Sequence, residues 1–162
     1  MSLRLSGFSS LATLLLVTAV AACGGGGGDD DGDDDGGDGI SASCQEATEH
    51  SDIEWIEENV FAGGCALSAS CHRGDAPDAN GLNLEAGMAA AALIGVPSQA
   101  QESDGLALVT PGDPENSYLL VILGQFGTDD ARIPEATGPM PFNSGLLCQE
   151  KRDAIQRWIE GL

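Results

Sequence analysis

Apolar side chains recur with the spacing of a helix soon after residue 50 of the chain. Ser51, followed three residues later by Glu54, forms the capping-box pattern that begins many helices. Gly63 and Gly64 interrupt the pattern, because glycine disfavours a helix interior. We therefore expect a helix between these two signals. Its apolar face consists of Ile53, Ile56, Val60 and Phe61, with Trp55 beside them.

The sequence predicts helices in three later segments as well. Alanine-rich residues 85–94 precede the breaking pair Gly95 and Pro97. Asp113 is a good N-cap, and Pro114 suits the first helical position, so a helix is expected from there to Gly124. A last helix begins near Cys148. It places Ile155, Trp158, Ile159 and Leu162 on one face.

The connecting segments are long and show no convincing sheet. Residues 106–110 form one short extended run, and residues 125–146 contain three prolines that exclude helix. We predict an all-α domain, a small bundle of three to four short helices with long loops. With only six aromatic side chains in residues 44–162, the core is poor in large groups. Disulfides or a bulky buried cofactor would help such a domain to fold.

The first 43 residues are not expected to belong to this domain. Residues 1–23 have the positive start, short apolar run and small residues of an export signal. Val20-Ala21-Ala22-Cys23 resembles the bacterial lipobox, which implies that Cys23 becomes a lipidated N-terminus held in a lipid bilayer. Residues 24–43 follow as a tether that is rich in glycine and aspartate and extended by charge repulsion. We expect an exported protein, anchored at the periplasmic face of a membrane or at the cell surface.

The charge of the chain limits its partners. Six basic and 26 acidic residues give a net charge of −20. Recognition of nucleic acid needs a basic face that binds phosphate, so no nucleic-acid partner is expected. The expected domain, residues 44–162, is itself acidic, with five basic and nineteen acidic residues.

The count of cysteines leaves two arrangements open. Once Cys23 is assigned to lipid, four cysteines remain: Cys44, Cys65, Cys71 and Cys148. An exported domain can oxidise them, so two disulfides would use all four. One disulfide together with a two-cysteine cofactor attachment would use them equally well.

Cys65 and Cys71-His72 form a compact segment that has the order of a c-type haem attachment site. In such sites two thiols bond to the haem vinyl groups and the following histidine binds the iron. The usual spacing places two residues between the cysteines, whereas five separate Cys65 from Cys71. The three extra residues would have to bulge outward.

The order of motifs around this segment resembles that of cytochrome c-like domains in exported proteins and lipoproteins of myxobacteria and planctomycetes. The resemblance spans about residues 52–162. After the Cys-His segment come Leu82-Asn83-Leu84, the turn Pro111-Gly112-Asp113-Pro114, Met140-Pro141 and a terminal helix with Trp158.

This resemblance implies a haem c bound covalently through Cys65 and Cys71, with His72 and Met140 as the axial iron ligands. Such ligation favours ferrous iron and leaves no open position for a substrate, so we expect an electron carrier rather than an enzyme. The acidic surface predicts a redox partner protein with a basic face. The family fold also implies crossed N- and C-terminal helices, which would allow a disulfide between Cys44 and Cys148.

A second interpretation uses the same fold without haem. Cys65 and Cys71 would then form a disulfide, and the protein would be a disulfide-stabilised lipoprotein module with a structural or protein-contact role. Peroxidase-like chemistry is a third possibility, and it would require that Met140 not bind the iron. Zinc binding by Cys65, Cys71 and His72 lacks a clear fourth ligand. His50 lies among polar residues and is expected to be solvated.

Overall fold

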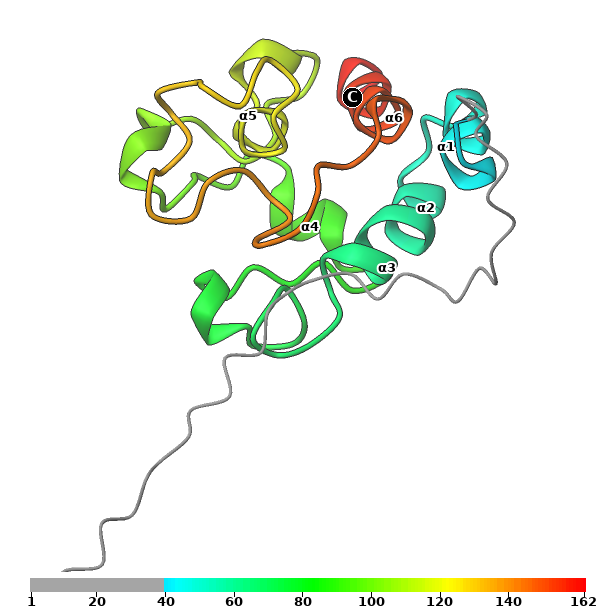
Figure 1. Ribbon diagram of the computed structural model, residues 1–162. Helices are drawn as coiled ribbons and strands as arrows, with labels where there is room; N and C mark the ends of the chain where they lie inside the picture. Colours follow the sequence, from blue (N-terminus) through cyan, green and yellow to red (C-terminus); the bar gives the residue numbers. More distant parts are fainter. Residues whose placement is uncertain (1–39) are drawn as a thin grey trace, which may run out of the picture.

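The computed structural model describes residues 40–162, and in this range the chain consists of short helices joined by turns and loops (Figure 1). The expected all-α class is confirmed for these residues, where pairing between extended segments is limited to two isolated bridges. The export signal of residues 1–23 and most of the tether lie outside the described residues. The first helix begins at Ala42, inside the last part of the segment expected to be tether.

The N-terminal helical region extends from residue 42 to residue 64. Helix α1 (Ala42–Glu46) continues into the 3₁₀ helix η1 (Ala47–Glu49). After a short break, helix α2 (Ile53–Ile56), the π-helical turn η2 (Glu57–Phe61) and helix α3 (Ala62–Gly64) follow without interruption. The expected end at Gly64 is confirmed.

The beginning of α2 differs from the expected capping box by one residue. The carboxylate of Asp52 accepts a hydrogen bond from the backbone N–H of Trp55 at 2.9 Å, so Asp52 rather than Ser51 is the N-cap. An aspartate side chain fulfils this role as well as serine does.

The alanine-rich helix is shorter than expected. Helix α4 spans only Ala89–Leu93, although residues 85–94 fit a helical pattern. Gly87 adopts a left-handed conformation with φ of +77°, and a turn therefore takes the place of the first helical residues. The buried carboxylate of Glu57 accepts hydrogen bonds from the N–H groups of Gly87 (2.6 Å) and Ala89 (3.0 Å), which holds this turn against η2.

The helix expected after Asp113 is divided in two. Asp113 caps the 3₁₀ helix η5 (Pro114–Asn116), as predicted, by accepting from the N–H of Asn116. Ser117 then leaves the helical region and α5 spans Tyr118–Ile122. The hydroxyl of Ser117 is buried, donates to the carbonyl of Asp113 at 2.8 Å and accepts from the N–H of Thr110 at 2.9 Å. These bonds replace the helical ones and produce the bend.

Two extended segments pair beside α4 without forming a regular sheet. Leu108 donates its backbone N–H to the carbonyl of Val96 at 2.7 Å, and Gly95 donates to the carbonyl of Val109 at 2.8 Å. The expected extended run at residues 106–110 is therefore present. Residues 125–146 contain turns and no helix, also as expected.

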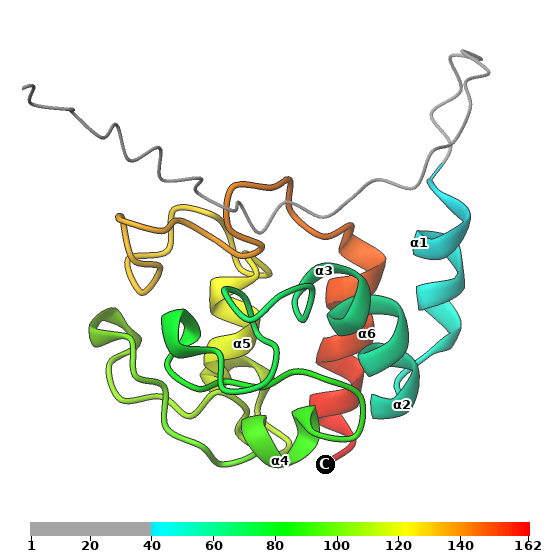
Figure 2. The same cartoon turned by 90° about the horizontal axis from the view of Figure 1, so that it is seen from below.

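Helix α6 (Gln149–Glu160) is the longest helix of the described chain and organises the core. It lies between α5 on one side and α1 and α2 on the other (Figure 2). Leu162, expected on its apolar face, lies beyond the helix and is 47% exposed. The face consists of Ala154, Ile155, Trp158 and Ile159, all buried.

Polar contacts reinforce the packing of α6 against the N-terminal region. Arg157 donates from Nη2 to the carbonyl oxygens of Ala47 (2.7 Å) and His50 (2.8 Å). Lys151 donates from Nζ to the carbonyl of Asn59 at 3.1 Å. Two of the five cations in this domain are thus used to join its two ends.

No helix within residues 40–162 has the length and hydropathy needed to cross a bilayer.

Candidate functional site

The Cys-His segment forms a closed loop directly after α3. The N–H of Cys65 donates to the carbonyl of Phe61 at 2.8 Å, which continues the helical region by one residue. The chain then turns through residues 66–71, and the N–H of His72 donates back to the carbonyl of Cys65 at 3.0 Å. The backbone of residue 72 therefore returns to that of residue 65, and the six intervening residues, 66–71, form a loop.

The orientation of His72 is set by the Leu82 backbone. Nδ1 of His72 lies 3.3 Å from the carbonyl oxygen of Leu82, and the N–H of Leu84 donates to the carbonyl of His72 at 2.8 Å. A carbonyl oxygen can only accept, so Nδ1 carries the hydrogen. In the neutral ring the lone pair is then on Nε2. This arrangement is typical of metal-binding histidines, which donate the other ring N–H to a fixed acceptor.

Burial favours the neutral form of this histidine. Desolvation lowers the pKa of His72 below its usual value, while the contact with the Leu82 carbonyl opposes that shift in part. A neutral imidazole is the form that binds a metal. Geometry and electrostatics together make Nε2 of His72 a competent ligand atom.

The cysteines differ in their bonding. Cys65 is a free thiol, and burial raises its pKa to about 11. Cys71 is disulfide-bonded. Since Cys65 is free, the expected alternative of a disulfide between Cys65 and Cys71 is not formed in this structure. Cys23, expected to carry lipid, lies outside the described residues.

The disulfide between Cys44 and Cys148 is present, as the sequence interpretation favoured. It joins α1 to the residue that precedes α6. The carboxylate of Glu150 lies close to these sulfurs, but two sulfurs bonded to each other offer no thiolate to a metal. This cluster is therefore not a metal site.

Met140 lies in the irregular segment between α5 and α6. Its backbone N–H donates to the carbonyl of Ile122, the last residue of α5, at 2.7 Å. Pro139 precedes it, and the peptide bond to Pro141 is cis. The side chain is half-buried and packs against the main core cluster.

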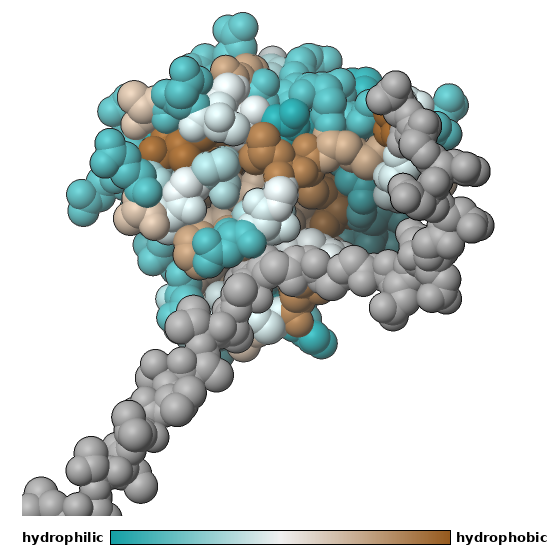
Figure 3. Space-filling view, in the orientation of Figure 1, coloured by the Kyte–Doolittle hydropathy of each residue, from teal (hydrophilic) through white to brown (hydrophobic). Residues whose placement is uncertain are grey.

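Two of the expected site residues, Cys65 and Met140, pack with Leu82 on the margin of this same core cluster, whereas His72 is not a member of the cluster. Figure 3 shows apolar residues gathered along a recess across the middle of the molecule. In Figure 1 the segment of residues 65–88 borders this region on one side and the segment of residues 125–147 on the other. The Met140 thioether lies at this apolar margin, and His72 is linked to the margin through its contact with the Leu82 carbonyl.

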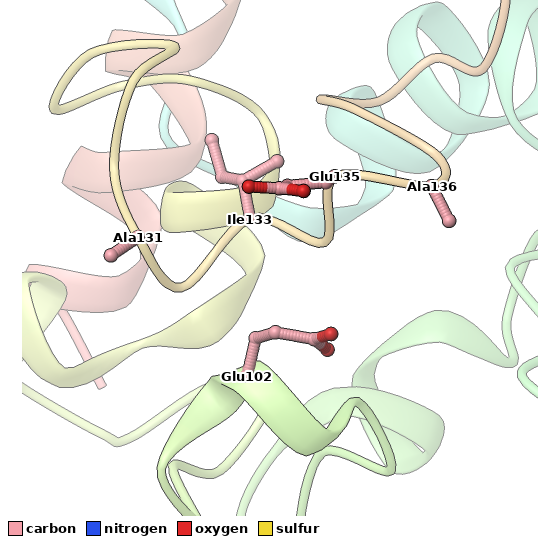
Figure 4. A pocket seen from close by; sticks show the side chains of 5 residues that line it. All are labelled: Glu102, Ala131, Ile133, Glu135 and Ala136. Atoms are coloured by element: carbon pink, nitrogen blue, oxygen red, sulfur yellow. The ribbon is translucent and has the colours of Figure 1, made fainter.

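A separate open pocket of about 630 Å³ lies beside the second, smaller core cluster. Glu102 stands on one side of it and Ile133 and Glu135 on the other (Figure 4). None of the expected site residues lines it. Its two carboxylates come from an exposed 3₁₀ helix and an exposed loop, and it has no histidine or cysteine ligand.

His50 is less solvated than expected. Its ring stacks on that of Trp55 with centroids 4.4 Å apart, and Nδ1 lies 3.1 Å from Oδ2 of Asp52. The sequence did not indicate this packing, because the immediate neighbours of His50 are polar and Trp55 lies five positions further along the chain. The sequence patterns also did not indicate the roles of Leu82, whose backbone carbonyl contacts the His72 side chain, and of Glu57, whose carboxylate accepts from backbone groups thirty or more positions away.

Comparisons of the chain with protein-family models, curated proteins and solved structures find no match.

Proposed function

We propose that this protein is a haem-binding, single-electron carrier of the cytochrome c-like kind, with His72 and Met140 as axial ligands. The observation that carries the proposal is the fixed orientation of His72. Its Nδ1–H is committed to the Leu82 carbonyl, its pKa is lowered by burial, and its Nε2 is left to bind iron.

The placement of Met140 supports the same assignment. Its backbone is held to the end of α5, and its side chain packs at the apolar margin that also includes Cys65 and Leu82. A thioether in such surroundings is a soft ligand that stabilises the reduced form of iron. The side-chain chemistry present therefore suits a large apolar macrocycle with two axial donors.

The packing of α6 against the N-terminal region also suits this fold. In the cytochrome c-like bundle the N- and C-terminal helices cross, and here the Arg157 and Lys151 contacts and the Cys44–Cys148 disulfide join these two ends. In the proposed bundle, the segments around residues 72 and 140 would cover the cofactor from two sides.

Covalent attachment is proposed at Cys65, whose thiol is free, and at Cys71 in a form of the protein whose Cys71 disulfide has been reduced. A thioether forms when the thiol adds across a haem vinyl group, with sulfur bonding to one vinyl carbon and the hydrogen going to the other. The addition itself consumes no oxidant or reductant. Because Cys71 is disulfide-bonded in this structure, a dithiol reductant must first give two electrons and two protons to that disulfide, releasing the Cys71 thiol and becoming a disulfide itself.

Bound haem would supply a one-electron iron couple. The chain would keep the imidazole oriented through Leu82 and present the Met140 sulfur from a loop tied to α5. It would also exclude water with the apolar margin of the core, which favours the less charged ferrous state. No catalytic residue is required, so the protein would be a carrier rather than an enzyme.

We further propose that the domain is exported and tethered to a membrane through Cys23. The apolar run before Cys23 and the aspartate- and glycine-rich segment after it motivate this assignment. Its redox partner would present a basic face, since the domain carries nineteen acidic and five basic residues. Metabolic labelling with a fatty acid, lost in Cys23→Ser, tests the anchor.

The deciding experiment is expression of the domain with a c-type haem maturation system, followed by intact mass and a pyridine haemochrome spectrum. Covalent haem is the expected result, with attachment points located by peptide mapping. His72→Ala should abolish the low-spin spectrum, and Met140→Ala should remove only the methionine ligand. A matured protein without haem would overturn the proposal.

A second candidate function is a haem-less module with a structural or protein-contact role. The observation that favours it is the bonding of the cysteines, because Cys44, Cys148 and Cys71 are all engaged in disulfides. The same mass measurement separates the two functions. A mature chain without haem and with its disulfides intact would establish this candidate.

A further inference from the structure

Two apolar side chains are exposed in or beside the turn that follows α5. Phe126 is 42% exposed and Leu146 is 40% exposed. Leu146 packs onto this turn, with Cδ2 lying 3.4 Å from the place that a Cβ atom on Gly124 would occupy. Phe126 lies two residues further along the same turn. We refer to these two side chains as the Phe126–Leu146 patch.

Carboxylates border the patch. Oδ1 of Asp153 accepts a hydrogen bond from Gln125 in the turn at 2.8 Å. Oδ1 of Asp129 lies 2.9 Å from the place of a Cβ atom on Gly127, immediately after Phe126. Within residues 40–162, neither aspartate forms an ion pair, so no cation neutralises either charge, although Oδ1 of Asp153 also accepts from Nε2 of Gln149 at 2.7 Å.

Of the two arginines near this turn, Arg132 is neutralised by an ion pair and Arg152 is not. Arg132 is paired with Asp130, with Nη2 and Oδ2 2.7 Å apart. Arg152 donates from Nη1 to the carbonyl of Gly124 at 2.6 Å and from Nη2 to Gln149. The Arg152 guanidinium stabilises the turn and keeps its positive charge beside it, so the rim has the two aspartates against one unpaired cation.

The patch is adjacent to the proposed haem ligand. The N–H of Met140 is bonded to Ile122, and Gly124 begins the turn only two residues later. A partner seated on the patch would therefore lie close to the Met140 loop. Transient electron-transfer contacts are small, with an apolar centre and a charged rim, which is the character of this surface.

We propose that the Phe126–Leu146 patch is the docking surface for a protein with an apolar contact centre surrounded by lysine or arginine. The choice of a cationic partner rests on charge complementarity with Asp129 and Asp153, which would steer its approach. The redox role of that partner rests on the proposed function. The docking surface itself can be tested whether or not haem is bound.

The test is nuclear magnetic resonance line broadening of the folded domain, with and without haem, by three chromium(III) complexes. Tris(phenanthroline)chromium is cationic and apolar, tris(ethylenediamine)chromium is cationic only, and hexacyanochromate is anionic. We expect the phenanthroline complex to broaden amides of residues 124–129 and 146 at a concentration roughly three- to tenfold lower than the ethylenediamine complex does. Hexacyanochromate should not broaden them.

Two sets of variants separate the apolar and charged contributions. Phe126→Ala with Leu146→Ala should remove the advantage of the phenanthroline complex, whereas Asp129→Asn with Asp153→Asn should weaken both cations. Met88→Ala, which truncates another exposed apolar side chain, is the matched control and should change neither. Sedimentation of the free domain tests the alternative that a second copy of the chain covers the patch, because it measures self-association.

Broadening centred elsewhere, or spread evenly over the acidic surface, would overturn the docking proposal. Self-association through this turn would overturn it as well, because the patch would then be covered by the protein itself. Localised broadening in a protein that takes up no haem would support the docking surface while removing the proposed electron-transfer role. The two proposals can therefore fail independently.

Discussion

Cys44 and Cys148 are joined by a disulfide with their Cα atoms 6.3 Å apart, although 104 positions separate them in the sequence. Cys44 lies in α1, a helix without any buried residue. Cys148 is the N-cap position of α6, whose apolar face is buried in the core. The bond therefore fastens an N-terminal helix without buried residues to the longest helix of the described chain.

Removal of this disulfide should strongly destabilise the domain. In the chain-entropy model, opening a loop of this length lowers the free energy of unfolding by about 4 to 5 kcal/mol. The double variant Cys44→Ser with Cys148→Ser, unfolded in urea beside the parent protein, measures the loss. Cys65→Ser provides the control because this thiol is free. An equal loss in both variants would contradict the assignment of stability to the disulfide.

Local signals predicted much of this fold. The start of α6, the cap at Asp113 and the stop at Gly64 follow from patterns within a few residues, and the structure has them. The shortened α4 could not be predicted, because the carboxylate that holds its first turn belongs to Glu57, thirty positions away from Gly87. The break at Ser117 likewise depends on a bond from Thr110.

In the candidate site, too, some features follow from local sequence signals and others depend on distant groups. The Cys-His order marked residues 65–72 as a compact segment, and the structure has a closed loop there, while haem attachment at this segment stays a prediction. The acceptor that orients His72 is a backbone carbonyl of Leu82, and a carbonyl leaves no signature in the residue types. The bonding of each cysteine was also open, because parity permits several pairings.

Glu57 is expected to be the most sensitive acidic residue of the domain. Its buried carboxylate accepts two backbone hydrogen bonds, from Gly87 and Ala89. Glu57→Ala leaves both donors without an acceptor, so we expect the free energy of unfolding to fall by roughly 2 to 4 kcal/mol. Chemical denaturation followed by circular dichroism measures this change.

Glu58 supplies the matched control for this experiment. It is the next residue in η2 and is exposed. Glu58→Ala should therefore change stability by less than about 0.5 kcal/mol. If the two variants are equally stable, the bonds from Gly87 and Ala89 contribute nothing and our account of α4 is wrong.

Asp130 should make stability depend on pH in the acidic range. The hydrogen bonds from Arg132, through its side chain and its backbone, lower the pKa of Asp130 to about 2. The unfolded chain binds a proton at the ordinary aspartate pKa of 3.8, before the folded chain does. The contribution is therefore present above about pH 4 and is lost as the pH falls toward about 2.

The size of this contribution should be modest, on the order of 1 kcal/mol, because water screens a pair near the surface. Asp130→Asn should remove it and flatten the corresponding part of the stability curve, measured by urea denaturation at a series of pH values. Asp129→Asn is the control, since its carboxylate forms no ion pair within residues 40–162. If Asp129→Asn flattens the stability curve and Asp130→Asn does not, the pH dependence does not come from Asp130.

His72 should produce a second pH dependence in the haem-free protein, near neutrality. Burial lowers the pKa of His72 in the folded protein below its ordinary value. As the pH falls below about 6.5, the histidine of the unfolded chain therefore becomes protonated before that of the folded protein does. Stability therefore decreases with falling pH, by at most about 1.4 kcal/mol per pH unit, until folded His72 also becomes protonated. His72→Gln, which cannot be protonated, should abolish this slope, whereas His50→Gln should retain it. A slope that persists in His72→Gln would show that His72 is not held as a neutral ligand, and the proposed iron site would lose its main support.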